Sequence, residues 1–521
     1  MKKSIIYFTI ATFLIPFALS AQEKKEEHVG FESATFYADS IQIMTLNFAK
    51  RSAYYLNLLP DKISMAKAEF GYQKGHYIPS QGATADRYGQ LYTEGSTRLG
   101  SVKLFGSFKY QKSYEDSTRF AHQTRNNLTT PYYFGSPGYV HYERGLYNFA
   151  AMASKSILKE KIIFGLDADY LVANHFSTND PRGAIGEYQL DVAASVAFKF
   201  SPIFKVGIGY RPGYGREDIN VAYKNPRYYE SSVFPMYYNH LINGYGEGRP
   251  VLSGLDRKYF NNFKRNGLDV YLDMTSVALG SFSFYGNYTK ETQTYFQTSD
   301  SGFKYFSNYD LEKIKAALLW LRPLNTNHKI GINLDFEKLD GADQNLEFKA
   351  NNYIYASQEI KAKIFLNKKT SSSSYNYYLN ASQYQQERID GIRANDLAYN
   401  NLLIEIGSGF RHQQLKNRFI GINLAIQYKM PINDTFRVAQ ANEGYFTRYV
   451  IYHDYLFNTS SYLGGSLSGE YSLPVFKTMQ ASFKINAGYM RKLEQQNLNR
   501  TIISEPGKDR FSSNISLNLY F

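Results

Sequence analysis

The last eleven residues of the chain, 511–521, alternate between apolar and polar side chains and end on an aromatic residue. Side chains of a strand point to opposite faces with a period of two, so Phe511, Ile515, Leu517, Leu519 and Phe521 share one face. The other face consists mainly of Ser and Asn. One face therefore needs an apolar medium and the other needs water. The wall of a transmembrane β-barrel with a wet lumen offers both.

The same alternation recurs in segments 102–111, 162–170, 330–337, 359–364, 421–428 and 482–489. Eight short connections, near residues 99, 159, 202, 279, 325, 369, 416 and 476, alternate with longer ones, the largest near 114–140 and 215–257. Short turns on one side and long loops on the other are typical of outer-membrane barrels. We predict a transmembrane antiparallel up-and-down β-barrel over residues 63–521, with about 18 strands. Counts of 14 or 16 remain open if some hairpins belong to loops.

Residues 1–21 have the pattern of a secretory signal peptide. Met1-Lys2-Lys3 is basic, Ser4 to Leu19 is mostly apolar, and the small residues Ser20 and Ala21 follow. An uncleaved membrane anchor is the alternative. The chain contains no Cys, which excludes a lipid-anchored cysteine and any disulfide. We expect a protein exported to the outer membrane of a Gram-negative bacterium, with both termini periplasmic.

Composition is consistent with a barrel. Aromatic residues make up 17% of the chain, including 48 Tyr, as the girdles at both rims of a barrel require. Beyond the signal the longest apolar run is 316–321, far below the roughly 20 residues of a membrane helix. The net charge of +13 is spread along the chain, so no nucleic-acid footprint is expected. The expected partners are outer-membrane lipid and glycolipid, the barrel-assembly machinery through the strand ending in Phe521, and another outer-membrane protein.

Residues 22–62 differ from the rest. After a charged tail, Asp39 or Ser40 is expected to cap a helix that runs through Ile41 towards Leu59 and stops at Pro60. Residues 30–60 are too apolar to hang free in the periplasm, so we predict that they dock inside the barrel from the periplasmic side and restrict passage. A packing element without a gating role and a periplasmic handle are the alternatives.

Enzyme motifs are absent from the sequence. The segment Gly207 to Pro212 begins like a dinucleotide fingerprint, but Pro212 replaces the third glycine. The nine His show no metal-binding spacing. His175, Ser177 and Asp180 lie close in sequence, which is common for loop residues. We therefore predict no enzyme, and no catalytic, cofactor-binding or metal site.

Charged residues on the polar strand faces are expected to line the lumen. Two carboxylate pairs at i, i+2, Asp167 with Asp169 and Asp335 with Glu337, resemble the acid–base pairs of enzymes. The favoured interpretation is a lumen wall whose charges are solvated or paired with lysines, namely Lys103, Lys109, Lys361, Lys363 or Lys484. Mixed signs argue against strong ion selectivity. The predicted lumen-facing residues are Lys103, Lys109, Asp167, Asp169, Asn333, Asp335, Glu337, Asn423 and Lys484.

The long loops concentrate Pro, Gly and aromatic residues, which indicates ordered loops that fold into the barrel mouth. There they could stack on a hydrophobic or sugar-like ligand, meet a partner protein, or simply cap the barrel. The aromatic candidates are Tyr132, Tyr133, Phe134, Tyr228, Tyr229, Phe234, Tyr237 and Tyr238.

The signal peptide ending Leu19-Ser-Ala-Gln22, the Tyr-rich strands, the lack of Cys and the Leu517-Asn-Leu-Tyr-Phe521 terminus resemble an uncharacterised family of outer-membrane β-barrels, a domain-of-unknown-function family. The chain is more weakly similar to long-chain fatty-acid channels, whose Asn-Pro-Ala signature is absent. Plugged TonB-dependent transporters need a longer plug than the residues before Ile63 allow. The function expected is a passive or gated channel for small solutes. The alternative is a non-conducting accessory barrel that partners an importer or secretion complex.

Overall fold

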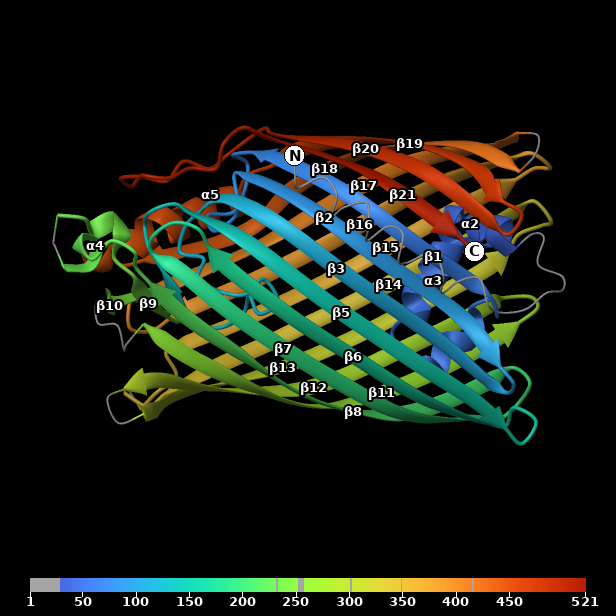
Figure 1. Cartoon of the computed structure of the whole chain (residues 1–521), viewed down its shortest axis with the longest axis horizontal. Coiled ribbons are helices and arrows are strands. Elements are labelled where there is room, and N and C mark those ends of the chain that lie inside the picture. The colour runs from blue at the N-terminus through green and yellow to red at the C-terminus, as the bar shows by residue number, and fades with distance from the viewer. Residues whose placement is uncertain (1–28, 231–232, 252–256, 300–301, 348, 415–416) are drawn as a thin grey trace, which may run out of the picture.

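The computed structural model describes residues 29–230, 233–251, 257–299, 302–347, 349–414 and 417–521, so the predicted signal peptide lies outside the described residues. The chain forms a closed antiparallel barrel of 18 strands (Figure 1). This confirms the predicted fold class and the predicted count of 18 strands, and excludes the alternatives of 14 and 16. The strands are β1 (Ile63–Gly75), β2 (Ala85–Leu99), β3 (Val102–Thr118), β5 (Val140–Ile157), β6 (Ile162–Ser177), β7 (Arg182–Lys199), β8 (Phe204–Ala222), β11 (Lys258–Ser276), β12 (Gly280–Ser299), β13 (Gly302–Pro323), β14 (His328–Asn345), β15 (Tyr353–Lys369), β16 (Ser373–Asp390), β17 (Asn395–Gln414), β18 (Arg418–Val438), β19 (Tyr462–Phe476), β20 (Met479–Lys492) and β21 (Asp509–Tyr520).

The last strand closes the barrel against the first. β21 pairs with β1 in the register Ala66↔Leu519 and Ala68↔Leu517, and with β20 on its other side. No strand of this sheet keeps a free edge over the described residues, and a free edge in lipid would leave backbone groups unpaired.

The two faces of the wall differ as the alternation predicts. Leu424 and Ile485, on the outward face, are 51% and 58% exposed, whereas the inward Asn333 is 8% exposed. Leu104, Leu166, Ile332 and Leu517, on the apolar faces of the alternating segments, follow the same pattern and are more exposed than their inward neighbours. The outward face thus presents an apolar surface to lipid. Among the described residues, no helix has the length and apolarity needed to span a membrane.

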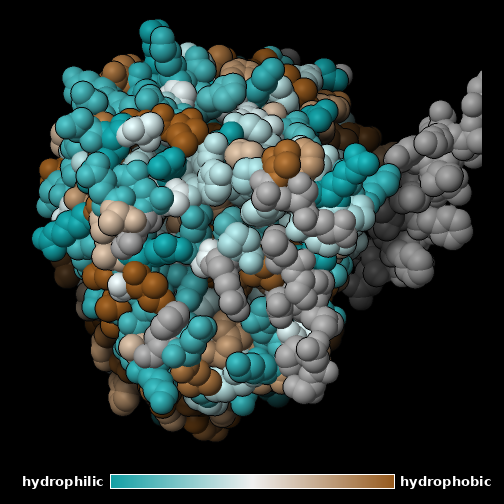
Figure 2. Space-filling view, turned by 90° about the vertical axis from the view of Figure 1, so that its left-hand side faces the viewer, coloured by the Kyte–Doolittle hydropathy of each residue, from teal (hydrophilic) through white to brown (hydrophobic). Residues whose placement is uncertain are grey.

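At one end of the barrel, which we call the loop end, the long connections fold into the mouth and form a cap. The cap contains a three-stranded sheet in the order β10 (Glu247–Pro250), β9 (His240–Asn243), β4 (Tyr132–Gly135). It also contains α4 (Arg227–Glu230), η3 (Pro235–Tyr237), η4 (Gln440–Asn442), η5 (Thr447–Ile451) and α5 (Tyr452–Asn458). A core of buried aromatic and aliphatic side chains joins these elements to the strands around the mouth. Figure 2 looks onto this end and shows it filled with mixed hydrophilic and hydrophobic side chains.

At the opposite end, the turn end, the N-terminal segment lies inside the barrel as α2 (Val29–Ala38), α3 (Ser40–Ala49) and η2 (Ala53–Leu58) (Figure 1). We call residues 29–62 the plug. It contacts strands from all parts of the wall: α2 meets β1, β20 and β21, α3 meets β13, β14 and β15, and η2 meets β3, β5, β6 and β7. The plug therefore crosses the lumen from wall to wall.

The single predicted helix from Asp39 to Leu59 is wrong in its extent. Asp39 does cap α3, accepting hydrogen bonds from the backbone N of Ile41 (2.9 Å) and Gln42 (3.2 Å). The helix ends at Ala49, however, and Ser52 caps a separate 3-10 helix. The break lies where Arg51 forms an ion pair with Asp335 of the wall, so tertiary contacts override the helical pattern.

Candidate functional site

Polar contacts tie the break in the plug to the barrel wall. Asp167 of β6 accepts hydrogen bonds from the backbone N of Ala53 (2.5 Å) and from Ser52 Oγ (3.4 Å). Arg211 of β8 donates from Nη2 to the carbonyl oxygen of Arg51 (3.3 Å). Together with the Arg51–Asp335 ion pair, these contacts tie the plug to β6, β8 and β14.

Apolar packing holds the plug more strongly. Phe36, Leu46, Phe48, Tyr55 and Leu56 are all buried against one another and the wall. Burying a large apolar side chain stabilises by about 1.5–3 kcal/mol, so expelling the whole plug would cost on the order of 10 kcal/mol. Thermal expulsion of the entire plug is therefore negligible.

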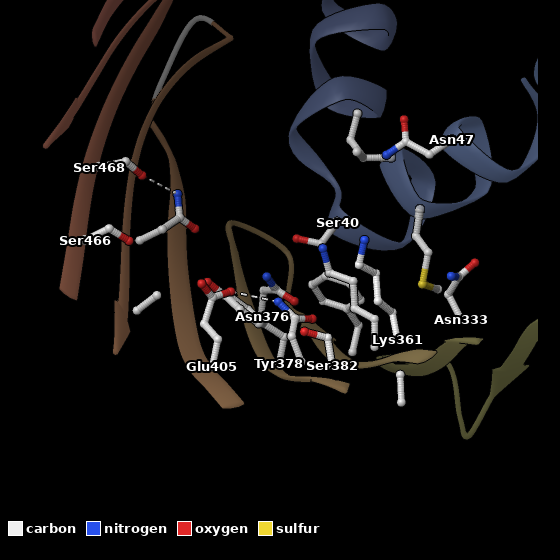
Figure 3. Close-up of a pocket in the computed structure, with 18 of the residues that line it drawn as sticks. Ser40, Asn47, Asn333, Lys361, Asn376, Tyr378, Ser382, Glu405, Ser466 and Ser468 are labelled. Carbon is white, nitrogen blue, oxygen red and sulfur yellow. Dashed lines mark hydrogen bonds between the residues drawn. The ribbon is translucent and has the colours of Figure 1, made fainter. Parts of the chain in front are cut away.

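The plug divides the lumen into two chambers. The first has a volume of about 740 Å³ and lies between α3 and strands β14 to β20. The second, about 640 Å³, lies on the other side of the plug against strands β2 to β13. Arg51 lines both chambers. Figure 3 shows the first chamber, where Ser40 and Asn47 of α3 face the labelled side chains of the strands across an open space.

Another cavity adjoins the first chamber on the turn-end side of the plug. It has a volume of about 510 Å³ and shares the lining residues Ala38, Ser40 and Asn376 with the first chamber. This outer cavity, the vestibule, is also lined by Asn327, in the turn between β13 and β14, and by Lys369 at the end of β15. Ala38 and Ser40, at the junction of α2 and α3, therefore border both the first chamber and the vestibule, and both have small side chains.

Each predicted lumen-facing residue has a definite place in the structure. Lys109, Asp167 and Asp169 line the second chamber. Asn333, Asp335, Asn423 and Lys484 line the first. Glu337 lines a smaller cavity near the cap, and Lys103 is buried under the plug, where it donates to the carbonyl oxygen of Leu59.

The predicted lysine partners of the carboxylates need correction. Asp169 accepts from Asn148 (3.0 Å), and Glu337 pairs with Lys315 (2.9 Å), its cross-strand neighbour in register. Asp167 and Asp335 are instead bound by plug atoms and arginines. Lys103 pairs with Asp61 (3.2 Å), and Lys361 and Lys484 with Glu359 and Glu470. The partners of these charged residues come from adjacent strands and from the plug. The sequence of one strand alone does not reveal which residues those are.

The cap is held by buried polar contacts as well as by its apolar core. Asn127 donates to Gln293 of β12 (3.1 Å), and the backbone N of Tyr245 donates to Asp390 of β16 (2.9 Å). His122 is fully buried beside Tyr142, and burial lowers the pKa of this imidazole to about 3. The imidazole of His122 therefore carries no charge in the cap core at neutral pH.

The predicted loop aromatics divide into two groups. Tyr132, Tyr133 and Phe134 form β4 and are buried in the cap core, so the interpretation as ligand-stacking residues is corrected for these three. Their rings pack on wall residues because β4 folds down into the barrel mouth. The remaining five lie half-buried at the tip of the cap: Tyr228, Tyr229, Phe234, Tyr237 and Tyr238.

The one catalytic constellation considered from sequence is not assembled. Ser177 Oγ accepts from the backbone N of Gly183 (2.8 Å), and Asp180 accepts from the backbone N of Lys224 (2.9 Å). Neither ring nitrogen of the buried His175 has a hydrogen-bond partner among the described residues. No group of three His, Cys, Asp or Glu suited to a metal ion occurs within the described part of the chain.

Sequence reasoning missed the residues at the entrance of the first chamber. Asn376, Tyr378 and Asn380 alternate along β16 and share its inward face. This alternation is visible in the sequence, where they are interleaved with Tyr377 and Leu379. Ala38 and Ser40 carry no comparable signal, because their place depends on how the plug sits in the barrel.

Comparisons with known proteins place the chain in a family. Residues 52–521 match a family of unknown function (DUF6850). The chain belongs to this family. The resemblance expected from sequence is thereby confirmed, and the match covers the whole barrel and the end of the plug of this DUF6850 chain. No curated protein is similar to it.

Several solved structures are similar to this DUF6850 chain at low levels. The siderophore receptor PiuA from Acinetobacter baumannii is 8% identical, with 89% of this chain and 82% of that chain covered and a TM-score of 0.39. The alcaligin outer-membrane receptor FauA from Bordetella pertussis is 9% identical, with 88% and 76% covered and a TM-score of 0.39. The FrpB iron transporter from Neisseria meningitidis is 9% identical, with 90% and 83% covered and a TM-score of 0.38. At these values the similarity carries no functional argument.

Proposed function

We propose that this outer-membrane barrel is a gated conduit for small polar solutes, closed at the loop end in the conformation described. The observation that supports this is that the first chamber and the vestibule adjoin beside the plug, where Ala38, Ser40 and Asn376 line both. A solute would pass from the vestibule into the lumen at this junction, without expulsion of the plug. In this proposal the turn end and both termini face the periplasm, and the cap is the outer gate.

Conductance measurements in planar bilayers test the proposal. Deleting residues 30–60 alone should raise the conductance little, because the cap remains in series with the widened lumen. Replacing cap residues 121–136 by a short Gly-Ser turn in the same variant should raise it by roughly tenfold or more, since barrels of this size without inner segments leave an aqueous channel. The full chain should show discrete openings smaller than those of the double variant. A full chain that stays silent while the double variant conducts would reject the conduit.

Cysteine labelling tests the side passage, since the chain has no Cys. Asn376→Cys should react with a small membrane-impermeant thiosulfonate at least about tenfold faster than Thr124→Cys, because thiol reactivity follows access and Thr124 is fully buried in the cap. Mass spectrometry of barrels in nanodiscs measures both rates. Equal rates for the two variants would contradict a passage from the turn end.

A non-conducting accessory barrel is the second candidate, and the cap favours it. A buried core across the loop end closes the lumen more thoroughly than two or three loops folded over a pore. In that case the half-buried aromatic side chains at the tip of the cap would be the surface for an outer-membrane partner. The silent full chain described above is the result that this candidate predicts.

A further inference from the structure

Uncharged hydrogen-bonding side chains dominate the lining of the first chamber. Six asparagines and four serines contribute to it, from α3 and from strands β14, β16, β18, β19 and β20. Several of them are labelled in Figure 3, where they surround the space below α3. The asparagines are Asn47, Asn333, Asn376, Asn380, Asn423 and Asn486. Each amide offers both donors and an acceptor, as a ligand with many hydroxyl groups requires.

The charges around this chamber cancel. Three of its four cations are held in ion pairs: Arg51 with Asp335, Lys361 with Glu359 (2.8 Å), and Lys484 with Glu470 (3.3 Å). The remaining cation, Lys363, lies over the ring of Phe365 (5.0 Å from Nζ to the ring centroid). The remaining carboxylate, Glu405, accepts from Asn380 (2.7 Å). Four cations and three carboxylates line the chamber, and Glu359, the partner of Lys361, lies just outside the lining, so almost no excess charge is left with which to select an ion.

Two acceptors beside the chamber lack partners. The Oδ1 atoms of Asn376 and Asn380 are buried and make no hydrogen bond among the described residues. A buried unpaired acceptor is costly, so turning either amide oxygen into the chamber, where a solute hydroxyl can donate to it, would stabilise this wall. Tyr378 lies between the two asparagines on the same face of β16 and also lines the chamber. Its ring offers an apolar surface to the C–H face of a sugar.

We propose that the first chamber binds an uncharged, polyhydroxylated solute of mono- to disaccharide size, which enters from the vestibule. The volume of about 740 Å³ lies within the range of small-molecule sites. The Asn376–Tyr378–Asn380 face of β16 supplies hydroxyl acceptors on both sides of a stacking ring. This assignment rests on the proposed conduit function, because it names the class of solute that the conduit would carry.

Saturation-transfer NMR with glucose, maltose and trehalose, each added to barrels in detergent, tests this proposal. At least one of them should receive saturation from the wild-type chain. Its binding should weaken by about tenfold or more in the Asn376→Leu, Asn380→Leu double variant, which removes two hydrogen-bonding amides. Asn148→Leu, a matched change in the second chamber, should leave binding unchanged.

A second variant guards against misfolding of the first. Ser466→Phe narrows the first chamber without removing an asparagine and should also weaken saccharide binding, and heat-modifiable migration in gels reports a folded barrel. Failure of all three sugars to bind the folded wild-type chain would overturn the proposal. Equal binding by the Asn148→Leu and the double variant would also overturn it, as would binding of succinate or lysine in place of the sugars. The conductance measurements do not depend on saccharide binding, so they test the proposed conduit function separately from this proposal.

Discussion

A chain lacking Leu517–Phe521 is expected not to form a barrel. These residues provide the register with β1 from Met65 to Ala68 and with β20 from Gln480 to Phe483. Without them two strands would present unpaired N–H and C=O groups to lipid, and each such group costs several kcal/mol. Heat-modifiable migration in gels should disappear, and the chain should become sensitive to protease.

The matched control for this deletion keeps the strand and changes only its last side chain. Phe521→Ala leaves every β1–β21 backbone pair in place, because the register ends at Tyr520. It should therefore still yield a closed barrel in refolding experiments with purified chain. A folded, protease-resistant barrel from the truncated chain would refute closure through β21.

Replacing Leu424 by Arg is expected to destabilise the folded barrel by about 2–4 kcal/mol, the usual cost of a cation on the lipid face near the bilayer midplane. Leu424 lies on the outward face of β18 and is half exposed there. Denaturant titration of the barrel folded into vesicles measures the change in the free energy of unfolding.

The adjacent residue provides the control. Asn423 lies on the inward face of the same strand and lines the first chamber, so Asn423→Arg places the same charge at the same depth in a wet lumen. Its cost should be far smaller than that of Leu424→Arg. Similar costs for the two variants would mean that the inward and outward faces of β18 have been exchanged.

The barrel itself could be predicted from sequence because its determinants are local. Period-two alternation such as that of 421–428 marks the two media on either side of the wall, and eight short turns fix the number of hairpins. The cap and the chambers depend on contacts between distant parts of the chain. Tyr132 is buried because Tyr295 and Asp343, far along the sequence, meet it at the mouth.

The plug illustrates the same limit. Its apolar content indicates burial, and the structure places it inside the barrel at the turn end. The break after Ala49 and the junction of cavities beside Ser40 depend on Asp335, Arg211 and β16, which segment 22–62 alone cannot reveal. Pairing of charges across strands requires a register, and register follows only once all strands are arranged in order.

The position of α2 has a consequence for the order of folding. The seam between β1 and β21 is the one strand pairing of the closed sheet that no hairpin connects, and α2 touches both strands from inside. Ser33 Oγ accepts from the backbone N of Ser64 (3.4 Å) and donates to the carbonyl oxygen of Phe521 (3.4 Å), and Tyr37 stacks on Tyr520. This docking surface exists only after the two ends of the chain have met. α2 precedes the barrel in the chain but can therefore dock only after the barrel has closed, and once docked it bridges β1 and β21 across the seam.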